Sequence, residues 1–263
     1  MANTIKKLGL AALLAAMPVN YSHAKGNSQD SNSNKKWEFS IGPSFGFSLS
    51  SPAKDFLDSE YNKIVSRERT SGDPVPNASN LNASNPIYMG VRADVERRLT
   101  DRYSAGVFMG YNSASQSASN SGVSNGAVRV NSNYNIKTSN ISLGAKGKAH
   151  FLNEKLNPYA GLGLNMVHVS GDYTIDTALV TSKVYNGSFS GNKVMPSLDL
   201  GADGKVYNGL SWDASFSLPV GNSVKSNWTE TKTQPAGNTS TDISADLKMP
   251  IRFNLALKWI FGK

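Results

Sequence analysis

From Trp37 onward the chain repeats one pattern, in which every second residue is apolar and the residues between them are small or polar. The clearest case covers 37–49, where the residues between the apolar ones are Ser, Gly and a single carboxylate, Glu38. A period of two places successive side chains on opposite faces of a β-strand, so a strand with two different environments is predicted. A soluble sandwich would carry Lys, Glu and Thr on its polar face, whereas such small groups suit the crowded inside of a narrow barrel.

Eight segments show this alternation, and each is predicted to be a strand. They cover 37–49, 87–96, 103–112, 141–151, 159–166, 194–203, 210–218 and 243–261. Upstream of the fourth segment, Tyr134 and Ile136 alternate with the opposite parity, so we expect a bulge or a loop edge near Ser139. Closed single-chain bacterial barrels have an even number of strands. The expected fold is therefore all-β, an eight-stranded antiparallel up-and-down transmembrane β-barrel.

The connections between these segments alternate between short and long. Four of them are long and rich in Ser, Asn, Gly and Thr, and we expect extracellular loops at about 50–86, 113–131, 170–192 and 221–242. Short turns at one end and long loops at the other are typical of outer-membrane barrels. The alternative is a soluble lipocalin-type barrel, which would bury its apolar face around a ligand.

Aromatic residues favour the membrane alternative, because they cluster near both ends of the predicted strands, as interfacial girdles do. Near the short turns lie Trp37, Phe39, Tyr103, Phe151, Trp259 and Phe261, and near the long loops lie Phe47, Tyr111 and Tyr134.

The N-terminus predicts export. Residues 1–24 have two lysines, an apolar stretch at 8–17 and a Ser-His-Ala end, which together indicate a cleaved signal peptide. Residues 25–36 contain no apolar side chain and are predicted to be a flexible periplasmic leader before the barrel at 37–261. No apolar run of about 18 residues occurs in the chain, which excludes a helical membrane protein. The 263 residues include no Cys and three His, so thiolate sites and His-rich metal sites are not expected.

The last strand resembles the C-terminal sorting signal of bacterial outer-membrane proteins, with alternating apolar residues that end in an aromatic one. Its apolar positions are Phe253, Leu255, Leu257, Trp259 and Phe261, and Gly262 and Lys263 follow, where the signal usually ends the chain. The segment 157–164 resembles a strand opening of small eight-stranded barrels of the OmpA-transmembrane, OmpX and opacity-protein type. This resemblance covers 37–261 and implies an outer-membrane barrel with periplasmic termini, placed by the outer-membrane assembly machinery.

If the apolar faces meet lipid, the opposite faces meet one another inside the barrel. The charged residues expected there, as a network of compensating ion pairs, are Glu38, Arg92, Asp94, Glu96, Lys146, Lys148, Asp199, Asp203, Asp213, Arg252 and Lys258. An eight-stranded interior is only wide enough for its own side chains, so a plugged lumen is predicted. Function is then expected on the loops, as a surface antigen or adhesin that meets lipopolysaccharide or a host surface, or supports envelope integrity.

Two alternatives stay open. The first is a narrow, porin-like channel for small molecules. The second is an outer-leaflet lipid hydrolase, because His168 and Ser170 lie two residues apart on one face of a strand, where a base can activate a hydroxyl. The pattern arises easily in a Ser-rich chain, so we do not expect an enzyme, a cofactor or a metal. Interspersed acids and the lack of a basic run with aromatics argue against a nucleic-acid partner.

Overall fold

The computed structural model describes residues 36–55, 81–124, 128–151, 156–178, 183–207, 209–221, 223–234 and 237–261. The predicted signal peptide, and all of the predicted leader except Lys36, lie outside these residues. No helix in the described ranges is both long enough and apolar enough to cross a membrane.

Eleven strands form one antiparallel sheet. They are β1 (Trp37–Phe47), β2 (Leu81–Ala83), β3 (Ile87–Arg98), β4 (Tyr103–Ser124), β5 (Val128–His150), β6 (Leu156–Ala178), β7 (Lys183–Tyr207), β8 (Leu210–Pro219), β9 (Ser223–Gln234), β10 (Gly237–Lys248) and β11 (Ile251–Phe261).

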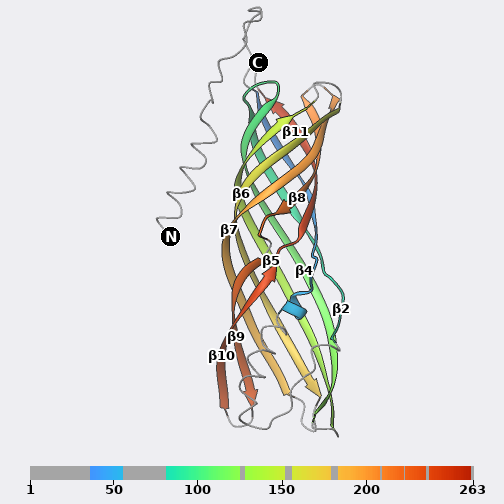
Figure 1. Ribbon diagram of the computed structural model, residues 1–263, viewed down its shortest axis with the longest axis vertical. Helices are drawn as coiled ribbons and strands as arrows, with labels where there is room; N and C mark the ends of the chain where they lie inside the picture. Colours follow the sequence, from blue (N-terminus) through green and yellow to red (C-terminus); the bar gives the residue numbers. More distant parts are fainter. Residues whose placement is uncertain are drawn as a thin grey trace, which may run out of the picture.

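Eight of these strands close into a ring, in the order β7, β6, β5, β4, β3, β1, β11 and β8, with β8 pairing back to β7 (Figure 1). The predicted eight-stranded antiparallel barrel is therefore confirmed. The first strand of the ring starts at the level where the last strand finishes, because Trp37 of β1 pairs with Phe261 of β11. We call this the terminal end of the barrel and the opposite one the hairpin end.

At the hairpin end the sheet continues well beyond the ring. β4, β5, β6 and β7 are 22 to 25 residues long, and β9 pairs with β7 past the end of β8. The expectation of loops at 113–131, 170–192 and 221–242 is therefore wrong, because most of each segment is strand. The hydrogen-bonded ladder continues there although lipid no longer imposes an apolar outer face. Of the expected loop at 50–86, residues 56–80 lie outside the described chain.

The predicted last strand, 243–261, is two strands with opposite inner faces. Ala245, Leu247 and Met249 are buried, whereas Leu255 and Leu257 on the same alternation are 44% and 50% exposed. The change occurs at Pro250, which has no N–H to donate to a ladder. Across the sheet, β8 and β9 are likewise separated near Gly221, whose φ is +71°.

Conversely, β5 contains no bulge near Ser139, contrary to expectation. Its pairing with β4 and with β6 runs without a register shift, and Tyr134, Ile136, Asn140 and Ser142 are all buried on one side. The parity of the apolar residues changes because the surroundings change along the strand. Apolar side chains point outward over one stretch of β5 and inward over the next.

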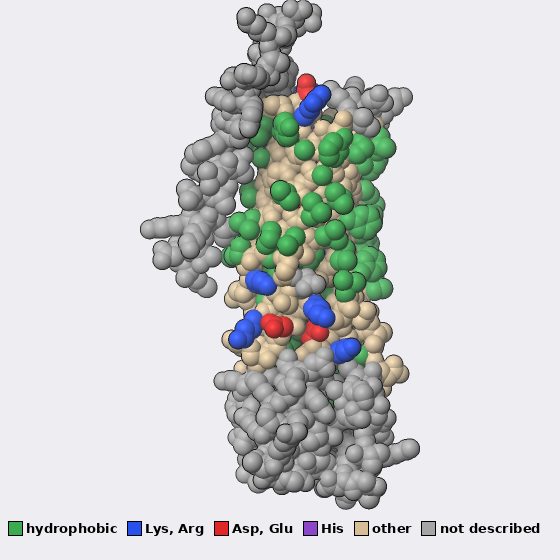
Figure 2. Space-filling model, viewed as in Figure 1, with side chains coloured by type: hydrophobic (Ala, Val, Ile, Leu, Met, Phe, Trp, Pro, Cys, Tyr) green, Lys and Arg blue, Asp and Glu red, His purple; other side chains and the backbone are tan. Residues whose placement is uncertain are grey.

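A band of apolar side chains covers the outside of the ring (Figure 2). Exposed large hydrophobic side chains occur on every strand of the ring, including Val107, Met109, Ile141, Leu143, Leu162, Leu200, Phe216 and Leu257. Exposed aromatic residues lie on both margins of this apolar belt, among them Tyr103 and Phe261 toward the terminal end and Phe47 and Tyr111 toward the hairpin end. Tyr134 is only 3% exposed and lies inside, so it does not belong to the expected girdle.

Candidate functional site

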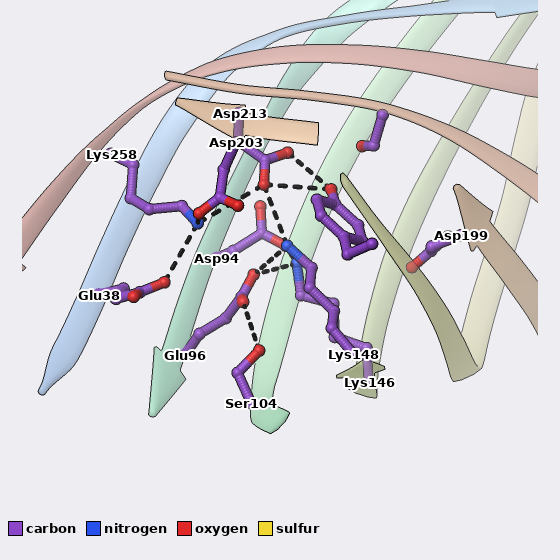
Figure 3. Close-up of polar contacts among 12 residues, drawn as sticks. Glu38, Asp94, Glu96, Ser104, Lys146, Lys148, Asp199, Asp203, Asp213 and Lys258 are labelled. Carbon is purple, nitrogen blue, oxygen red and sulfur yellow. Dashed lines mark hydrogen bonds and ion pairs between the residues drawn. The ribbon is translucent and has the colours of Figure 1, made fainter. Parts of the chain in front are cut away.

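The half of the lumen nearer the terminal end is filled by ion pairs between strands (Figure 3). Lys146 and Lys148 of β5 both point at Glu96 of β3, with Nζ–Oε1 distances of 2.5 and 2.8 Å. Lys146 also lies 2.5 Å from Asp94, and Lys148 lies 3.0 Å from Asp213 of β8. A buried charge without a partner costs several kcal/mol, so carboxylates shared between two lysines offset much of this penalty.

Lys258 of β11 joins a second group of ion pairs to the first. Its Nζ lies 3.1 Å from Glu38 of β1, 3.2 Å from Asp203 of β7 and 3.7 Å from Asp213. Arg98 of β3 contacts the same two carboxylates, Glu38 at 3.2 Å and Asp203 at 3.5 Å. Arg98 is not among the residues expected from the sequence, although it shares the inward parity of the two acids of β3.

Tyrosine, histidine and serine side chains complete this group. The Tyr159 hydroxyl donates a hydrogen bond to Asp213 Oδ1 at 2.9 Å, and Lys148 Nζ lies 4.1 Å from the centre of the Tyr159 ring. His150 Nε2 lies 3.1 Å from Ser104 Oγ. We call the charged residues of this region the ion-pair layer: Glu38, Asp94, Glu96, Arg98, Lys146, Lys148, Asp203, Asp213 and Lys258.

Further toward the hairpin end, two buried arginines lie among mostly neutral groups. Arg92 contacts Asp94 at 3.0 Å and Asp199 at 4.0 Å, and its guanidinium lies over the Phe108 ring. Arg252 donates to Ser142 Oγ at 3.1 Å and forms no ion pair within the described residues. The structure thus brings ten of the eleven residues expected in the network into ion pairs, and Arg252 is the exception.

Beyond the arginines, the interior becomes an apolar core. We call it the apolar layer, and its members are Ala53, Ala118, Tyr134, Ile136, Val167, Val169, Tyr173, Phe189, Met195, Val224, Trp228, Ala245, Leu247 and Met249. Trp228 is fully buried and stacks on Phe189, with ring centres 4.0 Å apart. Its Nε1 donates to Ser226 Oγ at 2.6 Å, which satisfies the polar atom of the indole.

A short segment, residues 48–55, completes this layer, and we call it the strap. It bridges β4 and β10 at the level where β1, β3 and β11 are no longer present. There β10 is one end of the sheet order, and β4, with the short β2 paired to it, is at the other. Gln116 of β4 accepts a hydrogen bond from Ala53 N at 3.2 Å and donates one to Ser51 Oγ at 2.7 Å. On the other side, Asp55 accepts one from Lys248 N at 3.2 Å. The strap therefore fills the gap in the wall.

The hydrolase candidates do not form a catalytic pair. His168 and Ser170 lie on the outer face of β6, but His168 Nδ1 bonds Asn192 Oδ1 at 2.8 Å and Ser170 Oγ lies 3.1 Å from Ser139 Oγ. No hydrogen bond joins the His168 ring to the Ser170 hydroxyl, two groups that the structure describes, and activation of the serine needs one. Throughout the described ranges, no three His, Asp or Glu side chains are grouped as metal ligands.

The residues of the expected sorting signal lie on the outer face of β11. Leu255, Leu257 and Phe261 are 44%, 50% and 57% exposed, and Phe253 and Trp259 are half-buried beside neighbouring aromatic rings. They belong to the apolar belt.

A closed ring of eight antiparallel strands, apolar outside and filled with ion pairs inside, leaves no unpaired ring edge among the described strands and presents hydrocarbon to its surroundings. The chain has the fold of a small outer-membrane β-barrel. No protein-family model matches it, and no curated protein matches it either.

Solved structures of other barrels resemble it at low sequence identity. A major outer membrane protein from Thermus thermophilus is 14% identical, with 86% of this chain and 99% of that chain covered and a TM-score of 0.44. Ail, the attachment invasion locus protein of Yersinia pestis, is 12% identical, with 87% and 99% covered and a TM-score of 0.36. Neisserial surface protein A is 11% identical, with 86% and 97% covered and a TM-score of 0.35.

Proposed function

We propose that this barrel is a non-conducting protein of the bacterial outer membrane that presents its hairpin end outside the cell for contacts at the surface. The observation that carries this proposal is the division of the molecule at the margin of the apolar belt. On one side the ring presents hydrocarbon outward, and on the other the sheet continues with polar side chains outward. Such a sheet would stand beyond the membrane as a rigid platform rather than a set of loose loops.

The orientation follows from the usual arrangement of these barrels, with short turns and both termini in the periplasm. In this barrel β3 and β4 are joined by four residues at the terminal end, Leu99 to Arg102, and β7 and β8 by two. The long strands of β4 to β7 extend from the opposite end. The hairpin end would therefore face the outside.

The orientation can be measured because the chain contains no cysteine. Ser117 is exposed on the outer face of β4 at the hairpin end, and Arg102 is exposed at the terminal end. A Ser117→Cys variant is expected to react with a membrane-impermeant maleimide on intact cells, whereas Arg102→Cys is expected to react only after lysis. The reverse labelling would overturn the orientation.

Two filled layers favour a closed lumen over the channel alternative. In planar bilayers, the refolded protein is expected to give no steady conductance, because the ion-pair layer and the apolar layer each occupy the interior. Regular, large openings would establish a channel instead.

A surface role is tested by shortening the β4–β5 hairpin without disturbing its register. Ser121 pairs with Asn131, so deleting 121–131 removes the tip and leaves the apolar layer intact. Cells that display the full chain are expected to bind host cells or matrix proteins better than cells that display the shortened chain. Heat-modifiable gel mobility checks that both are folded. Equal binding by the two would contradict surface recognition by this tip.

A further inference from the structure

Exposed lysines lie just beyond the apolar belt on one side of the barrel. Lys54 of the strap, Lys225 of β9 and Lys248 of β10 are exposed, and none of them forms an ion pair within the described chain. Figure 2 shows basic side chains at this level, with acidic ones between them, immediately past the hydrophobic zone. We call these three residues the lysine patch.

The three lysines belong to one local surface. Lys248 pairs with Ser223 of β9, so Lys225, two residues further along β9, is its diagonal neighbour on the same outward face. Lys54 precedes Asp55, whose carboxylate accepts a hydrogen bond from the Lys248 backbone. The backbone segments that carry the three lysines are therefore adjacent.

On two of the three chain segments, an exposed apolar residue lies before the lysine. Leu49, 67% exposed, precedes Lys54, and Val220, 55% exposed, precedes Lys225. Past Lys225, the outward residues of β9 are Asn227 and Thr229, both exposed and uncharged. From Val220 along β9, the outward side chains are thus apolar first, then cationic, then neutral and hydrogen-bonding.

This order matches the layers of a phosphorylated glycolipid seen from the side: acyl chains, then phosphates on the first sugars, then further sugar hydroxyls. We infer that the lysine patch binds the phosphates of outer-leaflet lipopolysaccharide. The inference rests on the proposed outer-membrane location and adds the ligand and the residues that hold it. Lysines near a lipid headgroup attract anionic lipid.

One carboxylate lies beside the lysine patch and distinguishes two modes of phosphate binding. Asp246 is exposed and pairs in register with Lys225. Asp55 is already engaged by the Lys248 backbone and by the Ser50 hydroxyl, at 2.9 Å. If the lysines bind phosphate directly, Asp246 opposes the ligand. If a divalent cation bridged protein and phosphate, Asp246 would instead be needed.

The test uses the full chain, refolded in zwitterionic detergent micelles and titrated with diphosphoryl lipid A that carries a fluorescent acceptor, with energy transfer from tryptophan as the readout. The triple variant Lys54→Gln, Lys225→Gln and Lys248→Gln is expected to bind at least about tenfold more weakly. The matched control, Lys36→Gln, Arg102→Gln and Lys205→Gln, removes three exposed cations at the terminal end and is expected to bind like the parent. Asp246→Asn is expected to bind more tightly.

The inference is overturned if the patch variant binds as well as the control variant, or if the parent binds dephosphorylated lipid A or phosphatidylglycerol equally well. Weaker binding by Asp246→Asn would replace lysine recognition with a cation bridge and also overturn it. These titrations do not depend on membrane orientation, which the maleimide labelling measures separately. The failure of this inference is therefore distinguishable from failure of the proposed function.

Discussion

Lys148 joins two carboxylates of the ion-pair layer that lie on different strands. Its ammonium lies 2.8 Å from Glu96 and 3.0 Å from Asp213, and it is buried. Lys148→Met keeps the volume of the side chain but removes the cation that Glu96 and Asp213 share. We expect a loss of about 3 to 5 kcal/mol in the free energy of unfolding, measured by urea unfolding in lipid vesicles.

Two further variants show whether the loss comes from the buried ion pairs. Lys205→Met changes an exposed lysine of β7 and is expected to stay within about 0.5 kcal/mol of the parent. Adding Asp213→Asn to Lys148→Met removes one of the two carboxylates that lost their lysine partner. This double variant is expected to recover part of the lost free energy of unfolding. If Lys148→Met were as stable as Lys205→Met, the ion pairs would contribute nothing to the fold.

At the scale of elements, the sequence predicts the strands of the ring because lipid and lumen impose opposite chemistry on the two faces. The contrast weakens beyond the belt, where Ser, Asn and Thr face water, so the outer parts of β4 and β7 resemble loops in sequence. The break at Pro250 is also hidden, because the apolar alternation continues through it while its direction reverses. Alternation reports that two faces differ, but not which face is inside.

The strap has no sequence pattern that predicts it, and its position depends on its contacts with β4 and β10. Gln116→Ala removes both hydrogen bonds that hold Ser51 and Ala53 to β4. Losing buried hydrogen bonds costs about 1 to 3 kcal/mol, so amide hydrogens of 48–55 are expected to exchange some ten- to hundredfold faster. Mass spectrometry of the exchanged peptides measures this. Ser117→Ala, next along β4 but on its outer face, is the matched control and is expected to leave the strap unchanged.

In the molecule as a whole, the interior of the barrel contains two layers of different chemistry. The ion-pair layer links strands around the ring by charge, and the apolar layer packs as the core of a soluble protein does. The sequence predicts the first, because its charges share the inward parity of the ring strands. The sequence does not predict the apolar layer. Apolar residues that point inward, such as Val167 and Trp228, cannot be told from apolar residues that point outward until their surroundings are known.

Because the two layers lie at different levels of the interior, we expect that side-chain truncation in one layer alone leaves the lumen blocked by the other. Trp228→Ala removes the centre of the apolar layer, and Glu96→Ala with Lys148→Ala removes one cation and one anion from the other layer. In planar bilayers we expect each of these variants to be silent and the triple variant that combines them to show a small, steady conductance. Gel mobility before and after heating checks that each variant is folded. A conductance in the Trp228→Ala variant equal to that of the combined variant would show that the apolar layer alone blocks the lumen, since the ion pairs would then leave a path for water and ions.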